Sequence, residues 1–300
     1  MVTLKLLRAY LDLTRLHFFF VWPLLFCSGL FLSFSRYGGF SWLLVAKASL
    51  IGFLGFEAGF VLNDYIDKEV DKSDIEYDKL TKYWRPFGTR PLSSGVISPN
   101  QAILFFVVLV LITSALIFTL PYPQSIYVFS IMVYSYIMES FYQIQKRSQK
   151  QPWAQLLGRT DFALFPVAGY LINGHPDIAT LLYFLFFYPF AQVHLGMNDI
   201  IDVVNDKARG MKTIPLLYGK KGTRTLIFLF TLLHFAGSVL FLPLGGLIMS
   251  VGITIGFLFV LGANLILFRG QSTVTWLKAL PLIHGAMVIY ILSIILDYFI

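Results

Sequence analysis

Nine apolar segments dominate the chain, and each is close to the roughly 20 residues that a helix needs to cross a bilayer. They cover residues 16–35, 40–62, 101–120, 124–142, 153–173, 178–197, 225–244, 245–268 and 276–300. The seventh and eighth form one block, divided here at Pro243, Gly245 and Gly246 because proline and glycine interrupt helices. Charged residues make up only 13% of the chain, against about 25% in soluble domains. The sequence therefore predicts an all-α polytopic membrane protein, with nine transmembrane helices around a central cavity, and excludes a soluble enzyme.

Lysine and arginine fall almost entirely on one side of such a topology. With a cytoplasmic amino terminus, 21 of the 23 basic residues lie on the cytoplasmic side, and only Arg36 and Lys47 lie on the other. Cytoplasmic loops of membrane proteins carry this excess. The pattern predicts a multi-pass protein with a cytoplasmic amino terminus. Topology and anionic lipid also account for much of the net charge of +7, so no nucleic-acid partner is expected.

Two cytoplasmic connections, residues 63–99 and 198–224, are much longer than the others. They and their helix ends hold ten of the 16 acidic residues. Acidic loops oppose the basic character expected on this side of the membrane, so these acids need counter-ions. We expect a single transmembrane domain over residues 1–300, with the two long loops capping the cavity and carrying the function.

The two long loops begin with an internal repeat. Residues 63–71 read N-D-Y-I-D-K-E-V-D and residues 198–206 read N-D-I-I-D-V-V-N-D, so that five of nine positions are identical. Four predicted spans lie between the copies, and because this number is even, both copies emerge on the same face of the membrane. In each copy Asn, Asp and Asp stand at i, i+4 and i+8, which places them on one helix face about 6 Å apart.

A column of side-chain oxygens with this spacing suits a divalent metal ion. Mg²⁺ prefers a few carboxylates, completed by water and substrate phosphate. Two facing columns would hold such ions between them, and a diphosphate would be clamped by the metal and by nearby lysine and arginine, which neutralise it as a leaving group. The candidate metal ligands are Asn63, Asp67, Asp71, Asn198, Asp202 and Asp206. Carboxylates at the membrane boundary are costly unless they are used, which favours this interpretation.

Other acids near the repeats receive less specific interpretations. Asp74, Glu76 and Asp78 are typical of a solvated helix end and are predicted to be structural. Asp161, beside Arg159, could form a buried ion pair or contact an acceptor, and the sequence does not decide between the two.

Two features concern the helices that lead into the loops. Gly52, Gly55 and Gly59 recur on the helix before the first repeat and are expected to be small-residue packing positions. His194 stands four residues before the second repeat and is expected to be structural. Ser98 and Pro99 predict the start of the third helix, with serine as the cap and proline at the first helical position.

The acidic repeats resemble the signatures of the UbiA-type intramembrane prenyltransferases. Asn63, Asp67 and Asp71 match the N-x-x-x-D-x-x-x-D signature of that family, and Asp202 with Asp206 matches its second, D-x-x-x-D signature. Nine helices also agree with the family. The resemblance covers essentially the whole chain.

Further segments extend the resemblance and imply roles for basic residues. The run R-P-L-S-S-G at 90–95 is similar to the R-P-[IL]-x-S-G that follows the first signature, and G-M-K-T-I-P at 210–215 is similar to the G-x-K-[ST]-x-P that follows the second. Tyr142, the basic pair after it and Thr14-Arg15 also resemble family positions. The resemblance implies that a diphosphate is bound by Arg15, Arg90, Lys146, Arg147 and Lys212.

The chain departs from the family between the first acidic signature and the R-P run. An insert of residues 72–89 stands where many members pass directly into that run. Lys82, Arg85 and Arg90 are therefore all candidates for reaching the diphosphate, and Arg90 is favoured.

The resemblance implies Mg²⁺-dependent transfer of an isoprenyl group within the membrane. The donor would be an allylic diphosphate, such as geranyl or geranylgeranyl diphosphate, and the acceptor a lipophilic or aromatic molecule. Diphosphate departure would leave an allylic cation, which Tyr142 would stabilise by cation–π attraction. Catalysis would depend on Asp67, Asp71, Asp202 and Asp206. An aromatic quinone precursor is the expected acceptor, and a geranylgeranylglyceryl phosphate-type ether lipid is the alternative.

Two other classes of protein share some of these features. A multi-span transporter can place carboxylates at a repeat interface, but acids at the membrane surface within long basic loops favour a bound polyphosphate. A transferase acting on CDP-lipids needs a D-G-x-x-A-R core, and the run D-K-A-R-G at 206–210 is only superficially similar to it.

Overall fold

All regular secondary structure in the described part of the chain is helical. The computed structural model describes residues 2–300, with side chains from Leu4 onward. Its α-helices are α1 (Val2–Leu13), α2 (Val21–Tyr37), α3 (Trp42–Asp67), α4 (Leu80–Trp84), α5 (Pro99–Ile117), α6 (Gln124–Gln145), α7 (Trp153–Gly158), α8 (Thr160–Tyr170), α9 (Ile178–Ile201), α10 (Val203–Ala208), α11 (Ile214–Phe241), α12 (Leu247–Arg269), α13 (Thr273–Leu277) and α14 (Leu280–Asp297). Short 3₁₀ helices are η1 (Leu16–Phe18), η2 (Val70–Ser73) and η3 (Leu242–Leu244). The predicted all-α class is confirmed.

Seven helical segments within residues 2–300 are long and apolar enough to cross a membrane. They are Leu16–Tyr37, Trp42–Asp67, Pro99–Ile117, Ile178–Ile201, Ile214–Leu244, Leu247–Arg269 and Thr273–Asp297. Their outer faces expose large apolar side chains, such as Leu111 on α5 and Leu258 on α12, as expected for contact with lipid. The chain is therefore an integral multi-pass membrane protein. The other two predicted spans fall on α6 and on α7–α8, so the count of nine stays a prediction.

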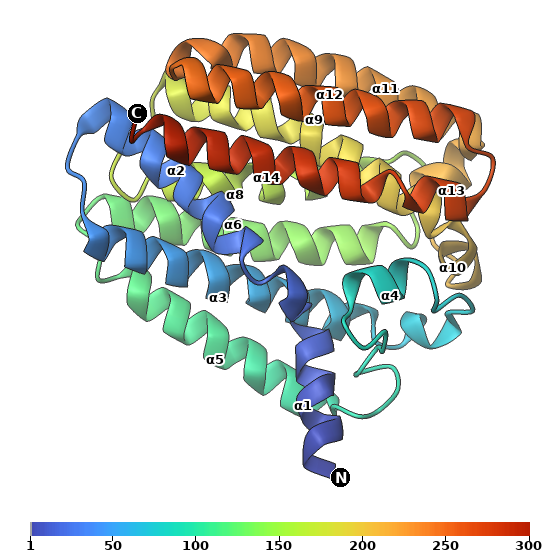
Figure 1. Cartoon of the computed structure of the whole chain (residues 1–300). Coiled ribbons are helices and arrows are strands. Elements are labelled where there is room, and N and C mark those ends of the chain that lie inside the picture. The colour runs from blue at the N-terminus through green and yellow to red at the C-terminus, as the bar shows by residue number, and fades with distance from the viewer. Residues whose placement is uncertain (1) are drawn as a thin grey trace.

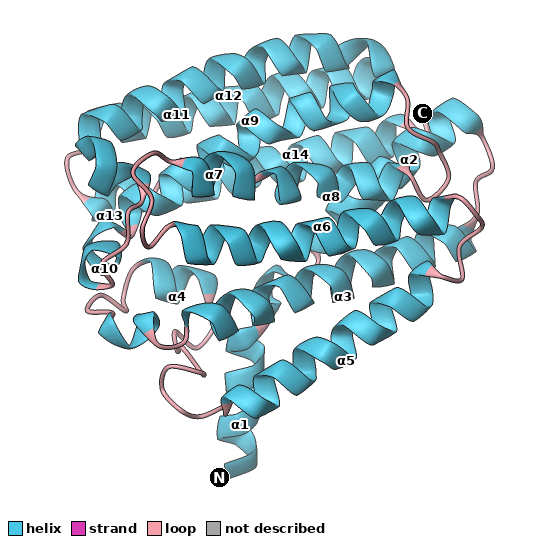
Figure 2. Cartoon of the chain, turned by 180° about the vertical axis from the view of Figure 1, so that it is seen from behind, coloured by secondary structure: helices cyan, strands magenta, loops and turns pink. Residues whose placement is uncertain are grey.

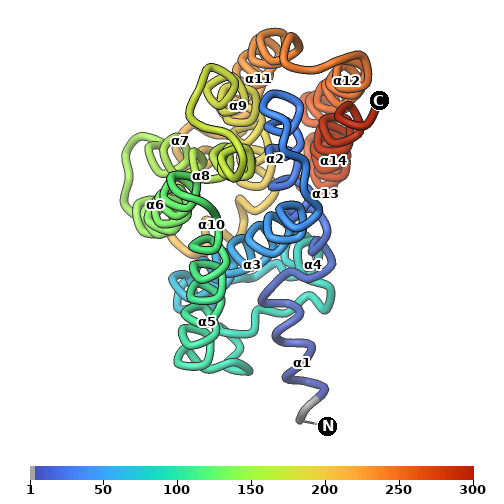
Figure 3. Tube along the Cα trace, turned by 90° about the vertical axis from the view of Figure 1, so that its left-hand side faces the viewer, coloured from blue at the N-terminus to red at the C-terminus, as the bar shows by residue number. Residues whose placement is uncertain are grey.

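The short helices gather at one end of the bundle. Figures 1 and 2 show α4, α10 and α13 together at the end opposite the carboxyl terminus, with the connections from α3 to α5 and from α9 to α11. Viewed along the bundle, α11 and α12 lie at one edge and α5 and α1 at the opposite edge (Figure 3). The two long loops therefore lie at the same end of the molecule, and we call this end the cap.

Helix ends follow the local signals in the sequence. Ser98 accepts the backbone N–H of Gln101, whose side chain accepts the Ser98 N–H in return, so α5 begins with a capping box at the predicted place. The long apolar block is divided between α11 and α12 by η3, which contains Pro243. The second long loop is shorter than predicted because α11 begins at Ile214 and bends at Gly219, whose φ of 66° favours glycine.

Glycines allow α2 and α8 to pack with their backbones in contact. A Cβ atom on Gly29 would lie 1.9 Å from the carbonyl oxygen of Pro166, and one on Gly169 would lie 1.8 Å from that of Phe26. Small residues commonly permit such approach between membrane helices. This contact holds the two helices at a fixed separation, and α8 in turn packs against α6 and α9 around the cavity described below.

Replacing Gly29 with alanine should therefore loosen the bundle. The added methyl group meets backbone that cannot move aside, so Gly29→Ala is expected to lower the free energy of unfolding by about 1–3 kcal/mol. Thermal unfolding of the detergent-solubilised protein measures this. Gly262→Ala is the matched control, because its Cβ would meet only Leu282 Cδ1 at 3.4 Å. Equal midpoints for the two variants would contradict the proposed backbone contact.

Candidate active site

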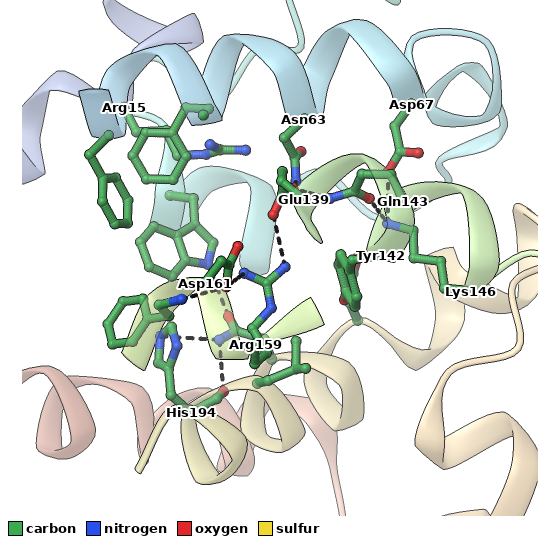
Figure 4. Close-up of a pocket in the computed structure, with 18 of the residues that line it drawn as sticks. Arg15, Asn63, Asp67, Glu139, Tyr142, Gln143, Lys146, Arg159, Asp161 and His194 are labelled. Atoms are coloured by element: carbon green, nitrogen blue, oxygen red, sulfur yellow. Dashed lines mark hydrogen bonds and ion pairs between the residues drawn. The ribbon is translucent and has the colours of Figure 1, made fainter. Parts of the chain in front are cut away.

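A cavity of about 280 Å³ lies beneath the cap and is enclosed by α3, α6, α8 and α9. Acidic and basic side chains line the end near the cap, and aromatic side chains such as Phe56 and Phe165 line the remainder. All six residues predicted as metal ligands line this cavity: Asn63, Asp67, Asp71, Asn198, Asp202 and Asp206. Figure 4 shows part of the site, with Asn63 and Asp67 on α3 opposite residues of α6 and α8. The two repeats thus share one cavity.

The acidic columns do not run along one continuous helix, and in this respect the sequence-based geometry was wrong. α3 ends at Asp67 and Asp71 lies in η2, whereas α9 ends before Asp202 and Asp206 lies in α10. In the second repeat, backbone hydrogen bonds from Asp202 N to Asn198 O and from Asp206 N to Asp202 O, both 2.9 Å, preserve the helical spacing. The columns therefore bend at the cap, and their third members still face the cavity.

Arg209 joins the two repeats directly. Its Nε lies 3.4 Å from Asp71 Oδ1 and also contacts Asp74 of the first loop, and its NH1 lies 3.2 Å from Asp202 Oδ2 and 3.5 Å from Asp206 Oδ1. Burial alone would lower the pKa of Arg209, but the surrounding carboxylates raise it above its ordinary value. The sequence analysis did not select this residue, although it lies three residues after the second signature.

Arg90, the arginine favoured for binding the diphosphate, forms ion pairs with two acids of the first loop. Its NH1 lies 2.6 Å from Asp71 Oδ2 and its Nε lies 2.5 Å from Asp74 Oδ2. The Asp74 side chain is fully buried, so its prediction as a solvated structural residue was wrong. Asp78 is exposed, as expected. Lys82 is also exposed and does not line the cavity.

Asp64 forms ion pairs with two further arginines, Arg85 and Arg15. Arg85 NH2 donates to both oxygens of Asp64 at 2.8 Å, and Arg15 NH2 donates to Oδ1 at 3.0 Å. Arg15 adopts a left-handed backbone conformation with φ of 47°, which is uncommon for a residue with a side chain. Its guanidinium lies 4.0 Å from the Phe60 ring centroid, and its NH1 is buried without a hydrogen bond. Arg15 therefore reaches the cavity wall with one donor group unused.

Asp67 is paired with the two basic residues after α6. Lys146 Nζ lies 2.8 Å from Asp67 Oδ2, and Arg147 NH2 lies 2.9 Å from Asp67 Oδ1. Lys146 lines the cavity, whereas Arg147 contacts Asp67 from outside the lining. Lys212 was predicted to bind diphosphate, but its side chain is exposed. Its contact with Lys146 is made by the backbone, from Lys212 N–H to Lys146 O at 2.6 Å. The structure thus brings Lys146 to the site and leaves the Lys212 side chain outside it.

Tyr142 lies at the cavity wall between two cations. Its ring centroid is 4.9 Å from Lys146 Nζ and 4.2 Å from Arg159 Cζ. A Cβ atom on Gly158 would lie 2.7 Å from Tyr142 Cβ, so glycine is needed where α7 packs against this tyrosine. The predicted aromatic residue is therefore present at the cavity and fixed by packing.

A polar network on α6 and α8 was missed by the sequence analysis. Glu139 Oε1 accepts from Asn63 Nδ2 at 2.6 Å and from Gln143, and its Oε2 accepts from Arg159 at 3.1 Å (Figure 4). Arg159 NH1 also lies 3.7 Å from Asp161 Oδ1, which realises the buried ion pair that the sequence left open. The i, i+3, i+4, i+7 spacing of Glu139, Tyr142, Gln143 and Lys146 is the signal that identifies this polar helix face.

Asn198 contacts the cap rather than presenting a free oxygen. Its Oδ1 accepts the indole N–H of Trp84 on α4 at 3.0 Å, and its Nδ2 donates to His194 O at 2.9 Å. His194 Nε2 lies 3.0 Å from His284 Nε2, and His284 Nδ1 lies 2.6 Å from the hydroxyl of Tyr83, also on α4. His194 is thus part of a polar chain that fastens α4 to α9 and α14.

The oxygen donors suit a hard divalent cation held jointly with a ligand. Burial raises the pKa of the Asp206 carboxyl well above its ordinary value, and the neighbouring Asp202 and Asp199 carboxylates raise it further. Asp71 Oδ1 is buried without a hydrogen bond. Among residues 4–300, no group of three or more Asp, Glu, His or Cys could hold a metal ion. This arrangement fits Mg²⁺, which commonly binds through one or two carboxylates together with water and substrate phosphates.

An all-helical membrane bundle with two acidic repeats under one cap is the architecture of an intramembrane enzyme for a polyanionic substrate. The chain belongs to the UbiA prenyltransferase family, whose sequence model matches residues 20–292. It is 27% identical over 249 residues to 4-hydroxybenzoate octaprenyltransferase of Tolumonas auensis, covering 83% of this chain and 79% of that protein. It is also 27% identical over 254 residues to digeranylgeranylglyceryl phosphate synthase of Thermococcus kodakarensis, covering 82% and 80%.

The fold has solved counterparts in the same family. A UbiA homologue from Archaeoglobus fulgidus, solved with DMAPP and Mg²⁺, superposes with a TM-score of 0.71 at 18% identity, covering 95% of this chain and 98% of that one. At this identity the likeness concerns the fold alone.

Removing the Arg209 guanidinium should destabilise the cap. In Arg209→Gln the buried carboxylates of Asp71, Asp74 and Asp206 keep one cation fewer, and loss of one partner of a buried ion pair costs about 3–5 kcal/mol. We expect a lower thermal-unfolding midpoint without metal, and a larger rise in that midpoint on adding Mg²⁺ than in the parent protein. Lys72→Gln, at an exposed pair with Glu69, is the control and should leave the midpoint unchanged. Indistinguishable midpoints for the two variants would show that Arg209 does not hold the repeats together.

Proposed function

We propose that this protein transfers an isoprenyl group from an allylic prenyl diphosphate to an acceptor within the membrane, with Mg²⁺ as cofactor. The observation that carries the proposal is the convergence of Asp71, Asp202 and Asp206 on Arg209 at the mouth of a cavity whose lining also includes several aromatic side chains. A charged mouth above an apolar chamber matches a substrate with a diphosphate head and a hydrocarbon chain. The family and both relatives are consistent with this activity.

The carboxylates and amides of the two repeats would hold the metal. These residues are Asn63, Asp67, Asp71, Asn198, Asp202 and Asp206. Bound Mg²⁺ supplies positive charge to the diphosphate oxygens and makes the diphosphate a better leaving group. The homologue from Archaeoglobus fulgidus, solved with DMAPP and Mg²⁺, supports this choice of cofactor and of substrate class.

Basic residues at the mouth would bind the diphosphate and hold it during departure. Arg90 and Lys146 line the cavity and are at present paired with Asp71 and Asp67. Arg15 has a buried donor without a partner. Arginine suits this role because its planar guanidinium can donate two parallel hydrogen bonds to phosphate. Arg147 and Lys212, which lie outside the lining, would act only through Asp67 and Lys146.

The chamber beneath the mouth would protect the allylic cation until the acceptor captures it. Tyr142 and the aromatic rings of the wall exclude water and present π faces, each worth about 0.5–2 kcal/mol to a nearby cation. Tyr142 is buried and packs against Gly158 at the cavity wall. We therefore assign the cation-stabilising role to Tyr142.

The acceptor is proposed to be an aromatic quinone precursor. The relative from Tolumonas auensis is a 4-hydroxybenzoate octaprenyltransferase, and Arg159 is a cation in the inner part of the site that suits an acidic ring substituent. A geranylgeranylglyceryl phosphate-type ether lipid is the second candidate. The equally similar synthase from Thermococcus kodakarensis favours it, and Arg159 would suit its phosphate equally well.

We also propose that the amino terminus and the cap face the cytoplasm. The support is the distribution of basic residues, of which 21 of 23 fall on that side of the nine-span topology. The prenyl diphosphate would then be taken from the cytoplasmic surface.

Conservative removal of one carboxylate from either repeat should abolish transfer. Asp67→Asn and Asp202→Asn retain size and hydrogen bonding but remove the charge that holds the metal, so turnover is expected to fall at least about 100-fold. The assay incubates the purified protein with Mg²⁺, allylic diphosphates and a membrane lipid extract, and follows diphosphate release and product mass. Asp78→Asn, at an exposed acid of the same cap, is the matched control.

Four results would be informative, two of them from added measurements of metal removal and of solute movement. Loss of turnover in both repeat variants, with Asp78→Asn active, supports the proposal, as does inactivation by EDTA that Mg²⁺ reverses. Full activity of either repeat variant would show that the carboxylate substituted in that repeat is not needed to bind the metal ion. Solute movement into vesicles without any diphosphate release from the parent protein would favour the transporter.

A further inference from the structure

A second, smaller cavity lies beyond the first, farther from the cap. Its volume is about 50 Å³, and its lining comes from α2, α3, α5, α6 and α8. The lining is apolar except for three hydroxyl groups, and that of Thr113 already donates to Leu109 O at 2.7 Å. Four residues, Gly55, Ser135, Tyr136 and Phe165, line both cavities. The two spaces therefore adjoin at these residues.

The second cavity continues the first along the helices. On α6 the lining passes from Glu139 in the first cavity, through Tyr136, to Met132 and Val128 in the second. At 1.5 Å per residue, Tyr136 and Val128 are separated by about 12 Å along the helix axis. Two neighbouring helices show the same order, from Gly59 through Gly55 to Ile51 on α3 and from Phe162 through Phe165 to Ala168 on α8.

Tyr136 lies at the boundary between the two cavities. Its hydroxyl donates to Gly55 O at 3.0 Å, which joins α6 to α3 across the boundary, and its ring packs edge-on against Phe106 at 5.5 Å. A Cβ atom on Gly55 would meet Thr113 Cγ2 at 3.6 Å and Tyr136 Oη at 3.9 Å, which are ordinary contacts. Close packing therefore does not require a glycine at position 55, and in this respect its prediction as a packing position was wrong. Gly52 does pack closely, because its Cβ would lie 2.6 Å from Phe26 Cβ.

We infer that the second cavity receives the distal isoprene units of the prenyl chain, and that Tyr136 with Gly55 sets the chain length the enzyme prefers. The inference rests on the proposed function, which places the diphosphate at the charged mouth and directs the hydrocarbon away from it. A largely apolar lining suits a hydrocarbon occupant. Tyr136 stands where a longer chain must pass and a shorter chain ends.

The test compares variants that change the passage in opposite directions. Tyr136→Ala opens it and should raise the preference for geranylgeranyl over geranyl diphosphate, whereas Gly55→Ala adds a methyl group beside the Tyr136 hydroxyl and should lower that preference. Because hydrophobic pockets discriminate by about tenfold or more per methylene, each ratio should change at least about tenfold. Tyr136→Phe removes only the hydrogen bond to Gly55 and keeps the ring. It should shift the ratio in the same direction as Tyr136→Ala. Because it preserves packing, it replaces the alanine variant if that variant fails to fold.

The ratio is measured in two ways on the full-length protein in lipid nanodiscs with Mg²⁺. Affinity for each diphosphate is measured without acceptor, and kcat/KM is measured with lipid extract. Tyr134→Phe is the matched control, because Tyr134 lies two residues away on the exposed side of α6 and bonds to Thr160 Oγ1 at 2.8 Å. Its ratio should equal that of the parent protein.

Trp22→Ala tests an alternative route for the prenyl chain. Trp22 stacks on Phe56 at 3.8 Å in the wall between α2 and α3. If Trp22→Ala changes the ratio while Tyr136→Phe and Gly55→Ala do not, the prenyl chain leaves the cavity between α2 and α3. That result would overturn the inference and leave the proposed function intact. If the parent protein neither binds nor converts any allylic diphosphate, the proposed function fails and the inference fails with it. Opposite shifts in the Tyr136 and Gly55 variants support the inference.

Discussion

The pairing of carboxylates from two distant loops with shared arginines is the interaction on which the cap depends. Arg209 alone contacts Asp71 and Asp74 of one loop and Asp202 and Asp206 of the other. Without these cations, like charges would repel one another at a depth where water screens them poorly. The intervening helices α4 and α10 have only five and six residues, too few to be stable alone. The ion pairs, together with the hydrogen bonds of Tyr83 and Trp84, therefore hold these short helices in place.

These ion pairs also explain how a ligand-free site can be both ordered and ready for a polyanion. Arg90 and Lys146 are held near their proposed positions by Asp71 and Asp67, so little side-chain ordering remains when a ligand binds. A diphosphate brought in with divalent cations adds both signs of charge together. In our proposal the acids exchange guanidinium and ammonium partners for metal, and the basic groups exchange carboxylate partners for phosphate. The buried charges stay balanced throughout.

The sequence predicted the features that arise from local pattern. Apolar length located the long helices, the capping serine located the start of α5, and the repeat located the two sets of acids. It could not predict environments created by contacts far apart in the chain. Asp74 is buried in contact with Arg209, which lies 135 residues away in the sequence. The residues near Asp74 in the sequence do not predict this partner. Glu139 lies in a largely apolar helix, and its partners Asn63 and Arg159 come from other parts of the chain.

Gly55 shows a different limit of sequence reasoning. A small residue on a membrane helix signals either a close helix contact or an open space, and the pattern of Gly52, Gly55 and Gly59 does not separate them. The structure does, because Gly52 faces Phe26 closely while Gly55 and Gly59 line the cavity. Only the neighbouring helices decide which applies.

The two asparagines of the repeat are equivalent in sequence but not in structure. Asn63 donates its amide N–H to Glu139, which leaves its oxygen for a ligand, whereas the Asn198 oxygen already accepts from Trp84 of the cap. A metal ion bound by Asn198 would share this oxygen with the Trp84 N–H, so metal binding at the second repeat would be coupled to the position of α4. Asn63 of the first repeat is bonded to Glu139 of α6 instead of to α4. The internal repeat therefore supplies two similar acidic columns, of which one is preorganised and the other is tied to the element that covers the cavity.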